Sequence, residues 1–420
     1  MDKKYTVAVI GCGNRGIGYI GEMLTHGGFT ITAICDVDDN QLLKTHSLFG
    51  IENALDFTDP DEFLKEKRAD VLVIATADRF HVEQGVKALN LGYDVLMEKP
   101  ISDSRGEIDL LLKTQEKTGK HVIVCHELRY GAGFKKCAEL IDQGKIGKLH
   151  SIEATERAVY WHWVQAYVRG VGASLEEGHP AILAKCSHDL DLVQSYAKSE
   201  CETVSSVGGL HFFKEENAPE GSTDRCVNCK HIDTCPYSAK KIYIDAWHAN
   251  GEPSYLWPYF RACETNPITE DGLWKGISEG RYGRCVFRCP VEKVDHQMVQ
   301  MQFKNGVTAC LTMTYAGNIG RRLAFYGTHG EIVFDERERN ILLMEYGENK
   351  VETINVDSLL LERNNAHGGG DMMLINELYE VLVGNMKPRT PLKESVECHL
   401  MGISAEESRL NGGKLIKVHQ

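Results

Sequence analysis

The stretch YTVAVIGCGNRG (residues 5–16) decides how the fold begins. An apolar, β-branched run ends in glycine, and GCGNRG fits the pattern G-x-G-x-x-G at the point where a strand gives way to a helix. The glycines let the backbone approach a pyrophosphate, and the helix N-terminus supplies free N–H groups. A glycine turn without a ligand is the alternative. We expect a dinucleotide site built from Gly11, Gly13, Asn14, Arg15 and Gly16.

A second strand, FTITAICD (29–36), ends in Asp36, which lies 20 residues after Gly16. An acid at this distance is expected to bind the adenosine ribose and to repel a 2′-phosphate. The sequence therefore favours NAD over NADP. Asn14 and Arg15 weaken this preference, because an arginine there could meet a 2′-phosphate.

Strand and helix patterns alternate up to residue 126, with further apolar strands predicted at 69–76, 93–100 and 120–126. This alternation is typical of a parallel, doubly wound sheet. We therefore predict a dinucleotide-binding domain over 1–126 and a second α/β domain over 127–420. The second domain should contain a helix over 179–197, a cysteine-rich insertion at about 212–290, antiparallel strands after it and a terminal helix over 371–384.

The composition is that of a globular protein, because 42% of the residues are hydrophobic and 25% are charged. A length of 420 residues is enough for two or three domains. The formal net charge of −13 disfavours a nucleic-acid partner. No apolar run reaches about 18 residues, so no membrane span is expected. The N-terminus runs directly into a strand without a signal peptide, which favours the cytoplasm, where the 14 cysteines should stay reduced.

The segment RCVNCKHIDTCPY (225–237) has the spacing C-x2-C-x5-C. Thiolates this close converge on one ion, and zinc prefers four tetrahedral ligands. We predict a structural zinc, with Cys289 or Cys263 as weaker candidates for the fourth position. An iron–sulfur cluster, a disulfide and free thiols are the alternatives. The predicted ligands are Cys226, Cys229, Cys235 and Cys285.

The stretch ILAKCSHDLD (182–191) combines metal ligands and proton carriers on one predicted helix. At helical spacing, Cys186 lies on the apolar side, whereas Lys185, His188 and Asp189 form a polar stripe. A Cys–His metal pair is therefore disfavoured, and the stripe is either a proton-handling surface or a solvated helix face.

Several segments together resemble the Gfo/Idh/MocA family of sugar oxidoreductases. They are VAVIGCGNRG (7–16), ATADRFHVE (75–83), MEKPIS (97–102), HELRY (126–130) and KCSHDLD (185–191). The resemblance implies a Rossmann domain followed by an α/β domain with a large, open, mostly antiparallel sheet. It places Lys99 beside the nicotinamide and the reacting hydroxyl, and it implies that Thr76, His81 and Glu98 line the cofactor cleft.

The family helix usually carries an aspartate four residues before a catalytic histidine, and here that position is Ala184. The resemblance supports His188 as the acid–base group, with Lys185 as a second cation on the sugar oxygen. Substrate contacts are expected from Asp189 and, since aromatic surface, forked donors and a glycine-rich turn suit sugars, from His162, Arg169 and His367.

These features predict an NAD-dependent oxidoreductase that acts on a sugar, cyclitol or glycoside hydroxyl. Two alternatives stay open: a glycosidase that oxidises a ring hydroxyl transiently and eliminates the aglycone, and a non-catalytic NAD-binding sensor. A homodimer or homotetramer is expected by analogy with the family.

Overall fold

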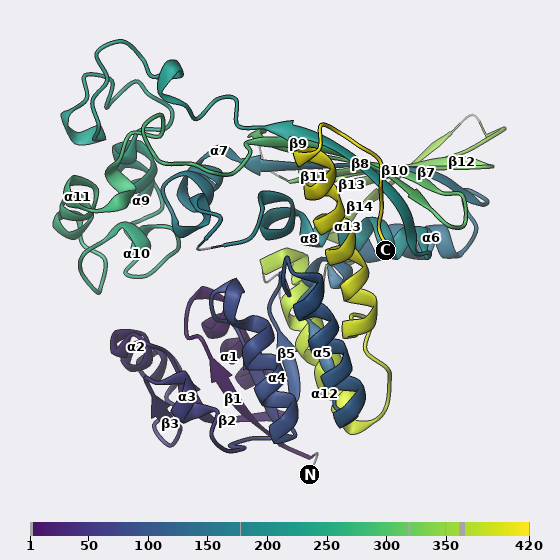
Figure 1. The fold of residues 1–420 in the computed structure, drawn as a ribbon, viewed down its shortest axis with the longest axis horizontal. Helices are drawn as coiled ribbons and strands as arrows, with labels where there is room; N and C mark the ends of the chain where they lie inside the picture. The colour runs from purple at the N-terminus through teal and green to yellow at the C-terminus, as the bar shows by residue number, and fades with distance from the viewer. Residues whose placement is uncertain (1–2, 177, 318–319, 349, 361–365, 420) are drawn as a thin grey trace.

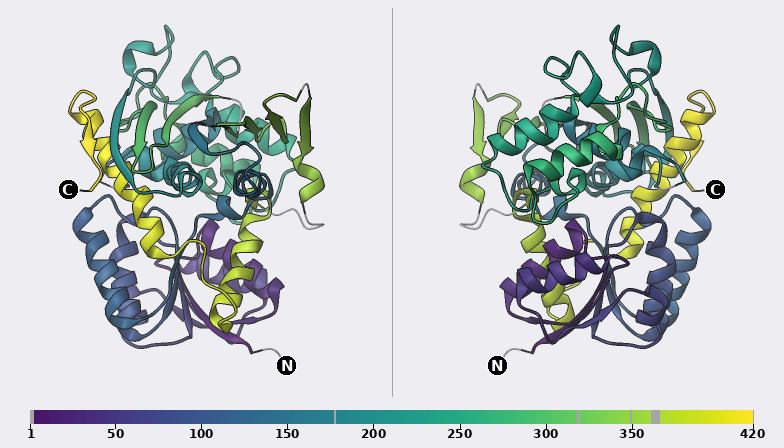
Figure 2. Two further views of the ribbon diagram at one scale, coloured as in Figure 1. Left: turned by 90° about the vertical axis from the view of Figure 1, so that its right-hand side faces the viewer. Right: turned by 90° about the vertical axis from the view of Figure 1, so that its left-hand side faces the viewer.

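The computed structural model describes residues 3–176, 178–317, 320–348, 350–360 and 366–419. The N-terminal domain forms the lower part of Figure 1, and the C-terminal domain lies above it with its sheet on the right. Figure 2 shows the same two-level arrangement from the sides.

The N-terminal sheet is parallel throughout, in the order β3-β2-β1-β4-β5-β6. All five predicted strands are present. The sixth strand, β3, was not predicted because its three residues are too few to show a period. Buried Val, Ile and Leu fill the strands, since helices cover both faces. The strands are β1 (Tyr5–Ile10), β2 (Phe29–Cys35), β3 (Leu55–Phe57), β4 (Val71–Ile74), β5 (Asp94–Met97) and β6 (Val122–Val124); the helices are α1 (Asn14–His26), α2 (Asp39–Phe49), α3 (Pro60–Phe63), α4 (His81–Leu91) and α5 (Arg105–Thr118).

The C-terminal sheet has nine strands in the order β14-β13-β12-β11-β7-β10-β9-β8-β15. Only β7 and β10 pair in parallel, so the sheet is mostly antiparallel, as predicted. Its strands are β7 (Leu149–Val159), β8 (Cys201–Gly209), β9 (His296–Phe303), β10 (Thr308–Gly317), β11 (Arg321–Gly327), β12 (Gly330–Asp335), β13 (Asn340–Glu345), β14 (Val351–Asn355) and β15 (Ile416–Lys417). The helices of this part of the chain are α6 (Ala132–Asp142), α7 (Tyr160–Trp163), α8 (Ala181–Ala197), α9 (Ala246–Ala249), α10 (Tyr259–Ala262), α11 (Glu270–Glu279), α12 (Gly370–Val383) and α13 (Leu392–Leu410).

The predicted insertion lies between β8 and β9 and carries α9, α10 and α11. It forms the upper left of Figure 1, beyond the edge of the sheet and above the N-terminal domain. No helix in the described part of the chain is long and apolar enough to cross a membrane.

The last two helices connect the domains. The sequence predicted one terminal helix, whereas the structure has both α12 and α13. Leu374, Ile375 and Leu378 of α12 belong to the core of the N-terminal sheet, and Leu392 and Val396 belong to the core on its other face. The chain thus returns to complete the domain with which it began (Figure 1).

This packing generates a stability prediction. Leu374 is fully buried between α12 and the N-terminal sheet. Leu374→Ala should lower the free energy of unfolding by about 2–5 kcal/mol, because the deleted methyl groups leave a cavity. Leu410→Ala is the control: that side chain is 69% exposed, so the loss should stay within about 0.5 kcal/mol. Chemical denaturation of both variants measures the difference, and equal losses would show that α12 does not carry this core.

Candidate functional site

The glycine turn between β1 and α1 requires its glycines for steric reasons. Gly11 has φ 92°, and a Cβ on it would lie 2.4 Å from the carbonyl oxygen of Ala75. A Cβ on Gly16 would lie 1.9 Å from the carbonyl oxygen of Gly11. The helix that follows begins at Asn14, so its free N–H groups face the end of the sheet.

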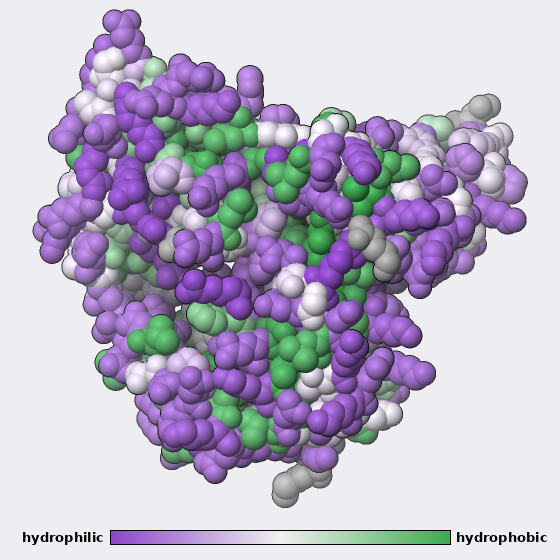
Figure 3. Space-filling view, in the orientation of Figure 1, coloured by the Kyte–Doolittle hydropathy of each residue, from purple (hydrophilic) through white to green (hydrophobic). Residues whose placement is uncertain are grey.

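A cavity of about 610 Å³ opens above this turn and is lined by Gly11, Gly13, Asn14, Asp36, Thr76 and Arg261 among others. Its size is in the range of sites for cofactors and other small ligands, about 300–1,000 Å³. In Figure 3 the surface is hollowed between the two domains. We call this the dinucleotide cavity.

Asp36 is held at the rim of the dinucleotide cavity. Its carboxylate accepts hydrogen bonds from the backbone N–H groups of Cys12 (2.7 Å) and Asp38 (3.0 Å). A carboxylate offers about four lone-pair positions, so two remain for the hydroxyls of a ribose. The geometry therefore fits the ribose-binding role that the sequence predicted.

The Arg15 side chain lies at the wall of the dinucleotide cavity and reaches into a cluster of acids. Its guanidinium donates to Glu98 (2.6 Å), to Asp371 (2.7 Å) and to Glu127. It is thus occupied by three carboxylates, and its possible contact with a 2′-phosphate stays a prediction. Burial opposes ionisation of Glu98, but the charges of Arg15 and Lys99, with the hydrogen bonds from Arg15 and Tyr19, together outweigh it and lower the pKa of Glu98.

Two other predicted cofactor residues lie behind the cavity wall. His81 is fully buried, and its ring nitrogens face the carbonyl oxygens of Pro100 (2.8 Å) and Thr76 (3.1 Å). Glu98 is buried against Arg15. Only Thr76 of the three lines the cavity, so the resemblance is corrected here: His81 and Glu98 position the backbone around the cleft without facing it.

Lys99 lies where the two domains meet. It follows β5 at the carboxyl end of the parallel sheet, and its Nζ donates to the carbonyl oxygen of Ala184 on α8 (3.3 Å). A second cavity of about 360 Å³ is lined by Lys99, Ala184 and Trp257. We call it the substrate cavity. It shares Val171 and Arg261 with the dinucleotide cavity, so a substrate there would adjoin the cofactor.

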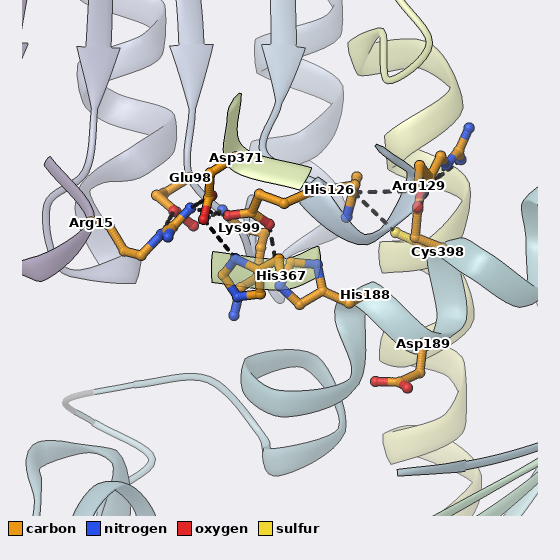
Figure 4. Close-up of polar contacts among 12 residues, drawn as sticks. Arg15, Glu98, Lys99, His126, Arg129, His188, Asp189, His367, Asp371 and Cys398 are labelled. Carbon is orange, nitrogen blue, oxygen red and sulfur yellow. Dashed lines mark hydrogen bonds and ion pairs between the residues drawn. The ribbon is translucent and has the colours of Figure 1, made fainter. Parts of the chain in front are cut away.

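His188 is buried next to this junction (Figure 4). Its Nε2 lies 3.5 Å from Oε2 of Glu127, and its Nδ1 has no hydrogen-bond partner among the described residues. Burial, with the charge of Lys99 next in importance, lowers the pKa of His188 well below its usual range. The imidazole is therefore neutral and keeps a free ring nitrogen, as a proton acceptor requires.

The helix stripe is not a solvated face, because α8 is buried nearly all round. Lys185 pairs with Glu156 (3.0 Å), and Asp189 pairs with Arg321 (2.8 Å). Burial raises the pKa of Asp189 to about 6 although Arg321 lowers it. Asp189 is thus corrected from a substrate contact to an internal ion pair. Cys186 is fully buried, as predicted.

The other predicted substrate residues do not lie together at one site. His162 packs edge-on against the Trp257 ring (4.8 Å between centroids), one layer behind the substrate cavity. His367, in a left-handed conformation (φ 55°), hydrogen-bonds Asp371 (2.9 Å) and lies 6.3 Å from the His188 ring. Arg169 is corrected: it is buried against the insertion, where it donates to the carbonyl oxygen of Tyr237.

All four predicted metal ligands line one small cavity of about 20 Å³ in the insertion. Cys263 lies elsewhere, against Thr265. Cys289 points back to the carbonyl oxygen of Cys285 (3.3 Å). The same cavity is lined by Arg169 and Ser238, whose Nη1 and Oγ have no partner in the described structure. The cysteines are Cys226, Cys229, Cys235 and Cys285.

Several residues of the site could not be predicted from the sequence, because no motif or spacing marks them. Arg261 comes from α10 in the insertion and reaches the rim of both cavities. Its Nη2 lies 3.8 Å from the position that a Cβ on Gly13 would take. Glu127 lies within the HELRY segment, but its pairing with Arg15 depends on the fold. Arg321 and Glu156 meet only because β11 and β7 are neighbours.

Comparisons with known proteins agree with this fold. Residues 5–126 match the Gfo/Idh/MocA family model described as an oxidoreductase family with an NAD-binding Rossmann fold, and residues 138–414 match its C-terminal α/β domain. YteT of Bacillus subtilis, named as an oxidoreductase, is 23% identical over 374 residues, which cover 84% of this chain and 82% of YteT. Myo-inositol 2-dehydrogenase of Thermotoga maritima is 24% identical over 221 residues, 53% of this chain and 63% of that relative.

Among solved structures, levoglucosan dehydrogenase in complex with NADH and levoglucosan aligns over 100% of both chains, with a TM-score of 0.74 and 14% identity. At this identity the likeness shows the fold. It includes the Rossmann domain and the second domain with the open sheet.

The position of Asp36 generates a cofactor prediction. The protein should bind NAD more tightly than NADP, and Asp36→Ser should weaken NAD binding by about 10- to 100-fold, because a hydrogen bond to a charged group contributes about 1.5–3 kcal/mol. Asp109→Ser, at an exposed position of α5, is the control. Calorimetry measures the dissociation constants; equal or tighter NADP binding by the unmodified protein would refute the assignment.

Proposed function

The chain belongs to the Gfo/Idh/MocA family of NAD-binding oxidoreductases, and we propose from this premise that it oxidises a secondary hydroxyl of a sugar, cyclitol or glycoside. The observation that carries the proposal is the junction of the two cavities. Lys99 lines the substrate cavity where that cavity adjoins the dinucleotide cavity, and His188 lies beside Lys99 with a free Nδ1.

Lys99 and His188 have complementary roles in the proposed reaction. The ammonium of Lys99, fixed by the carbonyl oxygen of Ala184, stabilises the negative charge that develops on the substrate oxygen. His188 accepts the hydroxyl proton at Nδ1. Glu127, 3.5 Å from Nε2, stabilises the imidazolium that forms. Bound NAD supplies the hydride acceptor.

The surrounding charges hold these groups in place. Arg15 fixes Glu127, and Asp371 fixes both Arg15 and the His367 ring. Lys185, which the sequence suggested as a second cation on the sugar oxygen, is neutralised by Glu156. We therefore assign Lys185 a positioning role at the floor of the site. The oligomeric state that the family resemblance implies stays a prediction.

His188 and Lys99 provide the test. His188→Gln and Lys99→Met should retain NAD binding and a near-normal melting temperature but lose hydride transfer by about 10²–10⁴-fold, the usual effect of removing a positioned acid–base group. Cys186→Ser, on the apolar side of the same helix, should keep most activity. NADH formation is followed with a panel of sugars, cyclitols and glycosides.

Three results would contradict the proposal. Full activity in His188→Gln would show that His188 is not the proton acceptor. Glycoside cleavage with catalytic NAD and no net NADH would instead identify the redox-neutral glycosidase. NAD binding with no turnover of any kind across the panel would favour the cofactor-binding sensor.

We further propose that the four cysteines of the insertion hold one thiolate-bound metal centre with a structural role. They converge on one cavity, beside a buried guanidinium whose Nη2 lies 3.3 Å from the sulfur of Cys226. Four thiolates around a divalent ion leave a net negative charge, and Arg169 compensates it. The unpartnered Nη1 of Arg169 also fits this role.

Zinc was predicted from the spacing, with an iron–sulfur cluster as an alternative, and the four sulfur atoms do not stand at zinc-binding distances from one another. Zn–S bonds of about 2.3 Å in a tetrahedron bring thiolates within about 4 Å of one another. Among the described residues, two groups place three ligand atoms within 4.8 Å, and these cysteines form neither of them. An iron–sulfur cluster holds its thiolates further apart, because iron and sulfide atoms lie between them.

Elemental analysis of anaerobically purified protein tests the metal centre. Iron with sulfide and a visible absorption band identifies the cluster, and about one zinc per chain identifies the single ion. Cys229→Ser should lose the metal and melt about 5–10 °C lower, at about 2–4 °C per kcal/mol. Cys310→Ser, on β10 outside the cavity, should keep both the metal and the melting temperature. A metal-free, well-folded unmodified protein would refute the site.

A further inference from the structure

Lys293 is a buried cation without a hydrogen-bond partner among the described residues. Its side chain, just before β9, is 3% exposed. Its Nζ has no hydrogen-bond partner in the described parts of the chain. The nearest neighbour of note is a glycine: a Cβ on Gly178 would lie 3.2 Å from the amine. A buried ammonium without a counter-charge is costly, so its position needs an explanation.

The described acids around Lys293 make no direct ion pair with it. Asp103 pairs with His179 (3.2 Å), and Glu292 accepts from the hydroxyl of Ser174 (3.0 Å). Both act on Lys293 only through longer-range attraction, as does Asp78. Burial dominates and lowers the pKa of Lys293 to about 8. The amine thus lacks the direct ion pair that would make it a structural cation.

Lys293 faces the substrate cavity and not the dinucleotide cavity. It is therefore not placed to bind the cofactor, unlike Arg261, which lines both. Among the described residues, the charged side chains lining the substrate cavity are Lys99, Arg261 and Lys293, against one acid, Asp78. This excess of positive charge stands in a protein whose net charge is −13. Such local potentials attract anionic ligands.

We propose that Lys293 binds an anionic group, a carboxylate or a phosphate, carried by the sugar-like substrate. The proposal rests on the proposed function, because it places a substituent of the same substrate whose hydroxyl Lys99 contacts. The two amines come from different domains, so the substrate spans the junction: its reacting hydroxyl lies at Lys99, and its acidic group lies at Lys293. Tyr167, whose ring centre is 5.9 Å from Nζ, adds aromatic surface beside the anion.

The experiment measures binding to the NAD-loaded protein by calorimetry, with glucose, glucuronate and glucose 6-phosphate and the corresponding galactose compounds as probes. At least one anionic probe should bind more than 10-fold tighter than its neutral counterpart. The tighter of the carboxylate and phosphate arms identifies the anion. Lys293→Met should weaken that binding by about 10- to 100-fold, the effect of losing a charged hydrogen bond, and Lys293→Arg should restore part of it. Lys304→Met, whose lysine pairs with Glu200 on the surface, should change nothing.

Folding of the variant is checked separately. Lys293→Met removes a buried, unpaired amine, so its melting temperature without sugar should equal or exceed that of the unmodified protein. Equal binding of the neutral and anionic probes, or an unchanged preference in Lys293→Met, would overturn the proposal. Because binding is read without turnover, these outcomes leave the hydride-transfer proposal intact. Loss of NADH formation in His188→Gln and Lys99→Met tests that proposal independently.

Discussion

The ion cluster around Arg15 is the constraint on which the site depends. One guanidinium from the first turn of α1 binds Glu98 after β5, Glu127 after β6 and Asp371 at the start of α12. A buried cluster of this kind is costly to dehydrate, and it is stable only when every charge has its partner. Once formed, it fixes the relative positions of the glycine turn, the strand end before Lys99, the segment leading to His188 and the last part of the chain. Loss of Arg15 would leave three carboxylates together in the centre of the molecule without their shared cation.

Much of the fold follows from local sequence patterns. The apolar strands of the first domain, the glycine turn and the α8 helix can be predicted because period and turn chemistry are local properties. The three-residue strand β3 is too short to show a period. The α13 helix was not predicted because residues on more than one of its sides are buried. Its apolar residues therefore do not form a single stripe.

The candidate site was predicted less completely, for a physical reason. Residue type and spacing identify Lys99, His188 and the cysteines, but the partner of a charge is set by the tertiary fold. Asp189 and Arg169 have the chemistry of sugar ligands, yet Asp189 pairs with Arg321 and Arg169 donates to backbone carbonyls inside the protein. Arg261 and Lys293, in contrast, belong to a segment of weak periodicity, and only its folding over the cleft gives them a role. The cysteine-rich insertion therefore contributes to the site, because its Arg261 lines the cofactor cleft.

The return of α12 to the first domain also has a consequence for biosynthesis. The first 126 residues leave the ribosome early, but the cluster that holds Glu98 and Glu127 lacks Asp371 until α12 has been made. At about 5–20 residues per second, the roughly 240 residues between them take on the order of 10–50 s to translate. During that interval the nascent domain exposes the apolar surface that Leu374 and Leu378 later cover. The cofactor cleft is thus among the last parts of the molecule to mature, although its defining motif is among the first to be synthesised.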